Sequence, residues 1–174
     1  MDARDLDAAV IIALGSNLAG AYDSSTQLLQ AAIERLPAGR VKVVARSPAW
    51  RSAAWPDPAV PTFVNAVVLV ETDLSPRELL ASLRAVEREF GRTRGEPNAP
   101  RTLDLDLIAH GRVVIAQPDF VLPHPRAHER YFVMGPLAQI APAWRHPVSG
   151  RTAAELAGAA SVGLDAAPTV NDRY

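Results

Sequence analysis

The chain of 174 residues contains no cysteine, which excludes disulfide scaffolds, thiolate metal sites and thiol nucleophiles. It has no apolar run of about 18 residues, so we expect no membrane span. Its 18 basic residues, all arginine except one lysine, are balanced by 19 acidic residues. The net charge of −1 argues against binding nucleic acid through bulk charge. The first nine residues lack the basic start of a secretory signal, so we expect a cytoplasmic protein.

The chain also lacks the glycine patterns of several common enzyme folds. It has no G-x-x-x-x-G-K-[ST] P-loop, no G-x-G-x-x-G after a strand and no G-x-S-x-G elbow. These absences exclude a Walker-type NTPase and argue against a Rossmann domain. With 48% hydrophobic and 21% charged residues, the composition is that of a globular domain. We expect a single domain over residues 10–164, a disordered or frayed N-terminus over 1–9 and a frayed tail over 165–174.

Hydrophobic spacing predicts an alternation of strands and helices. Strands are expected at residues 10–14, 41–46, 62–71 and 102–109, and helices at 24–36 and 76–90. Ser75 and Glu78 form a capping box, with Pro76 at the first helical position. This β-α-β-β-α-β order predicts a ferredoxin-like α+β sandwich with a mainly antiparallel sheet. Both helices would cover one face and leave the other free for a site between two long irregular loops, residues 47–61 and 91–101.

Smaller elements are expected toward the C-terminus. Residues 111–115 are predicted to form a hairpin with the strand at 102–109. Short helices are predicted over residues 126–132, 136–140 and 152–160.

The strand at 102–109 carries two acids, Asp104 and Asp106. Residues i and i+2 of a strand point to the same face, so the two carboxylates project together while Leu103, Leu105 and Leu107 enter the core. Adjacent carboxylates repel each other unless a cation lies between them, and they suit Mg²⁺ whose other ligands are waters and substrate phosphates. The alternative is an exposed strand face with two solvated acids, since D-x-D is a common pattern.

Arginine is concentrated just before this strand. Residues 84–101 hold Arg84, Arg88, Arg92, Arg94 and Arg101. Guanidinium groups match phosphate oxygens, so paired acids beside an arginine-rich loop favour phosphoryl-type transfer. Alternatively, Arg84 and Arg88 only solvate a helix face through pairs with neighbouring glutamates, Glu87 and Glu89.

Two further segments are candidate ligand contacts. Phe63 and Asn65 share one strand face, where an aromatic ring and an amide suit a flat heterocycle. The alternative is an ordinary core phenylalanine and a strand-end asparagine. His124, in a Leu-Pro-His-Pro turn, either donates to a phosphate or is simply structural, and Arg130 and Phe132 are ambiguous in isolation.

Together these motifs resemble the bacterial 6-hydroxymethyl-7,8-dihydropterin pyrophosphokinases of folate synthesis. The matching stretches are A-L-G-S-N-L from residue 13, F-V-N-A from 63, P-R-T-L-D-L-D-L from 100, L-P-H-P from 122, R-Y-F from 130 and G-P-L from 135. They follow the family order over residues 10–145, and P-R-T-L-D-L-D is the most specific of them.

The resemblance implies a reaction between ATP and a pterin in which AMP is the leaving product. Two Mg²⁺ ions would be held by Asp104 and Asp106. The pterin would lie between Phe63 and Phe132, with Asn65 at its pyrimidine edge. Backbone groups of two neighbouring residues, Ser52 and Ala53, would also bind it.

The resemblance also implies the residues that contact ATP. These are Arg92, Arg101, Leu107, His124 and Arg130. Arg92 and Arg101 would join the two aspartates as catalytic residues. We expect a monomer, with these two substrates as its partners and no nucleic acid or membrane.

The chain departs from the family pattern at three places. The loop before Pro100 is one residue shorter, and Asn98-Ala99 stand where the family often has Arg-Trp-Gly. Ala53-Ala54 replace a common Pro-Pro, and Phe63 replaces a frequent tyrosine. Stacking should survive these changes, whereas closure of the shortened loop over ATP is the step that they affect most.

Two other functions remain open on the sequence alone. A non-catalytic ligand-binding module would explain the fold but gives no reason for the paired aspartates. Another Mg²⁺-dependent phosphotransferase or hydrolase would use the same acids and release ADP or free phosphate. No residue is an obvious general base, so we expect metal-assisted deprotonation or proton loss to solvent.

Overall fold

The computed structural model describes residues 6–54, 59–91 and 102–169 of the chain. Within these residues, one six-stranded sheet has the order β5–β1–β4–β3–β8, and β2 also pairs with β4. The strands of this sheet are β1 (Val10–Ser16), β2 (Val41–Arg46), β3 (Trp50–Ser52), β4 (Phe63–Thr72), β5 (Asp104–His110) and β8 (Ala167–Pro168). All of its pairings are antiparallel. The structure is therefore a mixed α/β fold built on an antiparallel sheet.

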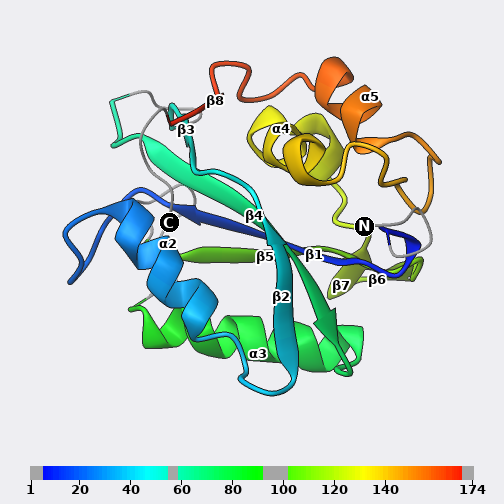
Figure 1. The fold of residues 1–174 in the computed structure, drawn as a ribbon, viewed down its shortest axis with the longest axis horizontal. Helices are drawn as coiled ribbons and strands as arrows, with labels where there is room; N and C mark the ends of the chain where they lie inside the picture. Colours follow the sequence, from blue (N-terminus) through cyan, green and yellow to red (C-terminus); the bar gives the residue numbers. More distant parts are fainter. Residues whose placement is uncertain (1–5, 55–58, 92–101, 170–174) are drawn as a thin grey trace.

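Helices cover both faces of the sheet. Figure 1 shows α2 (Ser25–Glu34) and α3 (Pro76–Glu89) on one side, and α4 (Tyr131–Ile140) and α5 (Ala153–Ala159) on the other. A short 3₁₀ helix, η1 (Ala127–Glu129), precedes α4.

β4 lies at the centre of the sheet. β1 pairs along one of its edges, whereas β2 and β3 share the other edge. Val64, Ala66 and Val68 pack in the core beneath α2 and α3. Val67 and Leu69 pack on the opposite face with residues of α4 and α5. The two-residue alternation predicted for this strand is confirmed.

The two predicted helices form, and the capping box expected at the second one is present. The Ser24 hydroxyl accepts the N–H of Gln27 at the start of α2, which ends at Glu34, two residues before the predicted end. At α3, Ser75 and Glu78 complete the reciprocal capping box. These contacts satisfy amide groups that the first helical turn leaves without partners.

The second face is not free, and this expectation was wrong for the part beneath α4. Met134 and Leu137 of α4 join Leu156 of α5 and Trp144 in a second buried cluster against the sheet. α4 is one continuous helix with Pro136 inside it, in place of the two short helices predicted. A Cβ added at Gly135 would lie 2.5 Å from the Trp50 ring, so the glycine allows α4 to approach β3 closely.

Short strands account for the other differences from prediction. β3 forms inside the 47–61 segment that was expected to be irregular. The predicted hairpin with the acid-bearing strand is wrong, since β6 (Ile115–Gln117) pairs instead with β7 (Phe120–Leu122) in a separate small sheet. Strands β3, β6 and β7 have only three residues each, so they show no recognisable alternation of apolar and polar residues in the sequence.

The described parts of both termini are ordered against the domain. Leu6 and Ala9 are buried in the second cluster. In the C-terminal segment, β8 pairs with β3 and Ala166 is buried. Residues 1–5 and 170–174 lie outside the described part.

Among the described helices, none combines the length and apolar character that crossing a bilayer requires.

Candidate active site

The paired acids lie on one face of β5, as predicted. Leu103, Leu105 and Leu107 are buried in the cluster beneath α2 and α3, while Asp104 and Asp106 are half-buried on the opposite face. Between the two acids, the N–H of Leu105 donates to the buried Glu87 carboxylate of α3 at 2.8 Å. Glu87 therefore holds β5 against α3, a role that the sequence did not indicate. Its neighbour Glu89 pairs with Arg35 rather than with the predicted arginine of its own helix.

Small residues of β1 separate these acids from β4. Gly15 pairs with Asp104 on one side and with Asn65 on the other, and Ala13 pairs in the same way with Asp106 and Val67. A Cβ at Gly15 would lie 3.4 Å from Asn65 Oδ1. The small side chain of Ala13 and the lack of one at Gly15 leave the space above this part of the sheet open.

The Asn65 amide is oriented by the neighbouring strand. Its Nδ2 donates to the Ser52 hydroxyl at 2.9 Å, and both side chains are buried. This hydrogen bond turns Oδ1 toward Gly15. Ser52 lies opposite Phe63 in the pairing of β3 with β4, so the strand register brings three of the predicted contacts together.

A cavity of about 700 Å³ opens over these residues. Its lining includes eight of the predicted site residues, namely Ser52, Ala53, Phe63, Asn65, Asp104, Asp106, Arg130 and Phe132. Gly15, Arg126 and Glu129 also line it, together with Val162, Gly163 and Asp165 from the C-terminal segment. Gly15 belongs to the A-L-G-S-N-L stretch that carries the family resemblance, whereas no periodicity or motif pointed to residues 162–165.

Arg130 connects the aromatic and acidic sides of this cavity. Its Nη1 lies 3.9 Å from Asp106 Oδ2, and its Cζ lies 5.9 Å from the centre of the Phe132 ring. A half-buried guanidinium in this position offsets carboxylate charge and presents donors to an anionic ligand.

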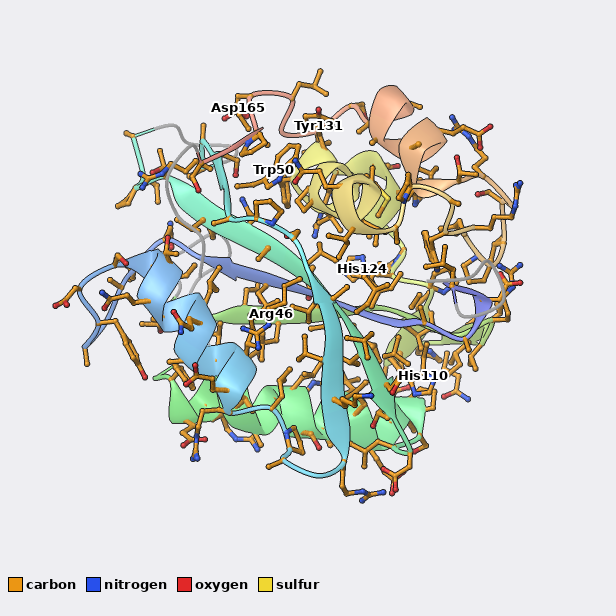
Figure 2. All side chains as sticks on the ribbon, viewed as in Figure 1. Arg46, Trp50, His110, His124, Tyr131 and Asp165 are labelled. Atoms are coloured by element: carbon orange, nitrogen blue, oxygen red, sulfur yellow. The ribbon has the colours of Figure 1, made fainter. Side chains whose placement is uncertain are left out.

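His124 and Leu107 line a second cavity of about 300 Å³, and Asp106 borders both cavities. Arg84 also lines this second cavity. His124 Nδ1 accepts the Arg126 N–H at 3.2 Å, which places the ring proton on Nε2. Figure 2 labels the His124 side chain. Burial, reinforced by the charge of Arg130, lowers the pKa of His124 to about 4. At neutral pH the ring is therefore an uncharged donor.

Two predicted catalytic residues, Arg92 and Arg101, lie outside the described residues. Among the described residues there is no group of three or more His, Asp or Glu side chains arranged to hold a metal ion. A pair of carboxylates beside open space is nevertheless the donor set that Mg²⁺ uses when substrate phosphates supply other ligands.

The arrangement brings together groups for binding two kinds of chemical structure. Phe63, Phe132 and the Asn65 amide offer aromatic surface and edge hydrogen bonds to a flat ring. Asp104, Asp106 and Arg130 offer metal ligands and a phosphate donor within the same cavity. The site can therefore hold a heterocycle next to a metal-bound phosphate chain.

Known proteins are similar to this chain in sequence, and others are similar in fold. A family model for 7,8-dihydro-6-hydroxymethylpterin-pyrophosphokinase matches residues 11–142. A 2-amino-4-hydroxy-6-hydroxymethyldihydropteridine pyrophosphokinase from Synechocystis is 42% identical over 147 residues, covering 84% of this chain and 73% of the relative. The enzyme of that name from Pseudomonas aeruginosa is 41% identical over 150 residues, covering 86% of this chain and 90% of the relative.

A crystal structure of wild-type HPPK-DHPS from Plasmodium falciparum has the same fold, with a TM-score of 0.66 over 86% of this chain. The two sequences are 12% identical, and this chain spans 44% of that one, so the likeness concerns the fold alone. The family match and the bacterial relatives carry the assignment. The chain belongs to the 7,8-dihydro-6-hydroxymethylpterin-pyrophosphokinase family.

Proposed function

We propose that this protein transfers the pyrophosphoryl group of ATP to the hydroxymethyl group of 6-hydroxymethyl-7,8-dihydropterin and releases AMP, a step of folate synthesis. The observation that carries this proposal is the opening of Asp104 and Asp106 into the same cavity as Phe63, Asn65 and Phe132. The names of the bacterial relatives agree with the reaction.

The larger cavity is the proposed pterin site. The ring would lie between Phe63 and Phe132, and its pyrimidine edge would meet the amide of Asn65. The Asn65–Ser52 hydrogen bond supports this role, because it fixes the amide before the ligand arrives. Backbone groups of Ser52 and the carbonyl of Ala53, whose N–H donates to Asp165, would complete the contacts.

The smaller cavity is the proposed nucleotide site. Leu107 would contact the nucleoside, and the Nε2–H of His124 would donate to a phosphate oxygen. Because Asp106 borders both cavities, the phosphate chain would pass the acids and reach the pterin site. Arg130, with Arg92 and Arg101, would bind the phosphates.

Asp104 and Asp106 would hold two Mg²⁺ ions. Their shared strand face and open surroundings fit this role, and Arg130 near Asp106 already offsets part of the negative charge. Bound there, Mg²⁺ supplies charge neutralisation and alignment of the phosphate groups.

In the proposed reaction, the hydroxymethyl oxygen attacks the β-phosphorus of ATP. The new P–O bond forms as the bond from the β-phosphorus to the α–β bridging oxygen breaks, and AMP carries that oxygen away. We assign no general base, and the hydroxyl proton passes to solvent. The aromatic residues and Asn65 orient the acceptor, whereas the arginines stabilise charge on the transferred group.

Product analysis tests the proposed function. The protein is incubated with ATP, 6-hydroxymethyl-7,8-dihydropterin and Mg²⁺, and the nucleotides are separated. AMP in equal amount to pyrophosphorylated pterin is expected. ADP or free phosphate would instead support another phosphotransferase or a hydrolase, and Mg²⁺-independent binding of an ATP analogue without turnover would support a binding module.

We also propose a ferredoxin-like description of the fold and a cytoplasmic monomer. The order β5–β1–β4–β2, with α2 and α3 on one face, supports the topology. Light scattering of the purified protein tests the monomer, for which a mass near 18.6 kDa is expected.

A further inference from the structure

The C-terminal segment of residues 161–169, called the strap below, crosses the edge of the larger cavity. It leaves α5 and is held first at the start of α4. The N–H groups of Ser161 and Val162 both donate to the Glu129 carbonyl at 3.0 Å, and the Tyr131 N–H donates to the Val162 carbonyl at 2.8 Å. These bonds place the following residues of the strap against the cavity wall.

Gly163 brings the strap against Phe132. Its φ is +69°, and a Cβ added there would lie 2.4 Å from Phe132 Cδ1. The strap backbone therefore lies directly on the ring that forms one wall of the proposed pterin site. A residue other than glycine would require both a strained backbone and movement of the ring.

Asp165 brings the strap to Ala53, which also lines the cavity. Its Oδ2 accepts the backbone N–H of Ala53 at 2.5 Å, a contact between residues 112 positions apart in the chain. Beyond it, β8 pairs with β3, and the Thr169 N–H donates to the Ala49 carbonyl at 2.9 Å. Figure 2 shows Asp165 and Trp50 at the same end of the molecule, beside the start of α4.

Asp165 is linked to the Asn65 amide through Ala53 and Ser52. Ala53 follows Ser52, whose hydroxyl accepts the Asn65 amide, and Asn65 lies on the floor of the cavity. The Asp165 carboxylate, by holding the Ala53 N–H, holds the end of β3 in place. Because Ser52 at this end accepts the Asn65 amide, the same contact helps to orient Asn65. Charge-assisted hydrogen bonds to backbone N–H groups are about twice as strong as neutral ones.

We propose that Asp165 is a positioning residue of the pterin site and that the strap completes this site by joining separate parts of its lining. This inference rests on the proposed function, since it assigns the larger cavity to the pterin. Asp165 acts through Ala53 and Ser52, and it leaves the nucleotide side unaffected because Leu107 and His124 line the other cavity.

Steady-state kinetics of Asp165→Ala, Asp165→Asn and the neighbouring control Leu164→Ala test this inference. Leu164 is 64% exposed, so its removal changes the strap surface without removing the Asp165 contact. Asp165→Ala should raise the KM for the pterin about tenfold, the scale of one charge-assisted hydrogen bond, with little change in the KM for ATP or in Tm. Asp165→Asn should recover most of this loss, since its amide oxygen still accepts the N–H.

Several results would overturn the assignment. These are an unchanged or lower KM for the pterin in Asp165→Ala, an equal rise in both KM values, or failure of Asp165→Asn to recover binding. Fluorescence titration of the pterin against each variant separates this test from turnover. If the wild-type protein bound pterin but formed no AMP, the proposed reaction would fail while the Asp165 comparison could still be made by binding.

Discussion

The guanidinium of Arg130 lies 3.9 Å from the carboxylate of Asp106 within the larger cavity. Arg130 is thus positioned to reach a phosphate chain held at the acids. Arg130→Ala should lower kcat/KM for ATP by about 10- to 100-fold, the range expected for a lost hydrogen bond to a charged group. Arg130→Lys should recover only part, because lysine keeps the charge but not the planar pair of donors.

Arg112→Ala is the matched control for Arg130→Ala. Arg112 is exposed and lies 3.6 Å from Asp7, and it lines neither of the two cavities. Its removal should leave kcat/KM for ATP near the wild-type value. Wild-type ATP kinetics in Arg130→Ala would contradict the phosphate-binding role.

Ser52→Ala should weaken both stability and pterin binding. It leaves Nδ2 of the buried Asn65 without its hydroxyl acceptor, which costs about 1–3 kcal/mol of unfolding free energy. The freed amide can also rotate, so the KM for the pterin should rise. Urea unfolding and kinetics check these effects, and Ser82→Ala on the exposed side of α3 is the control. Unchanged unfolding and pterin kinetics would show that the bond does not orient Asn65.

Two helical glycines should respond to alanine in opposite directions. Gly135→Ala places a Cβ 2.5 Å from the Trp50 ring and should destabilise the protein by about 1–3 kcal/mol through overpacking. Gly158→Ala in α5 meets no atom within 4 Å, so it should stabilise by up to about 1 kcal/mol through helix propensity. Thermal unfolding distinguishes the two variants. Equal effects at both sites would contradict the close contact of α4 with β3.

The stability should decrease as pH falls from about 6.5 to about 4. The folded-state pKa of His124, about 4, lies below the ordinary histidine value of about 6.5. Between these values the unfolded chain binds a proton that the folded protein excludes, so stability is gained as pH rises through this window. The His124 contribution should be on the order of 3 kcal/mol.

His124→Asn tests this pH dependence, since asparagine is neutral and can still accept the Arg126 N–H. The difference in unfolding free energy between wild type and variant should change most between pH 4 and 6.5. Burial also lowers the pKa of His146, so part of the wild-type slope should persist in the single variant. An identical slope in both proteins would contradict the assignment to His124.

Local signals in the sequence were sufficient for β1, β2, β4 and β5 of the sheet and for the paired acids. The alternation in β4 and the capping box at Ser75 each express a physical requirement of a few neighbouring residues. The same holds for Asp104 and Asp106, whose common face follows from the two-residue period of a strand. The D-x-D pattern indicates a ligand site only together with the strand register, which pairs Asp104 with Gly15 and Gly15 with Asn65.

Long-range contacts explain what the sequence could not predict. β3 has only three residues, and it exists because Trp50 pairs opposite Asn65 and packs against Gly135. Separate helices were expected over residues 126–132 and 136–140, yet packing keeps α4 continuous across Pro136. Asp165 stands in a small, polar stretch with no periodicity, and its partner Ala53 lies 112 positions away.

The central claim is that Asp104 and Asp106 together hold the metal that pyrophosphoryl transfer requires. Single-turnover formation of AMP should be measured for Asp104→Asn and Asp106→Asn at saturating ATP, pterin and Mg²⁺, with Asp73→Asn as an exposed control. We expect both site variants to lose about 100-fold or more in rate with an unchanged Tm, and the control to match wild type. Near-wild-type rates of AMP formation in both Asp104→Asn and Asp106→Asn would contradict the claim.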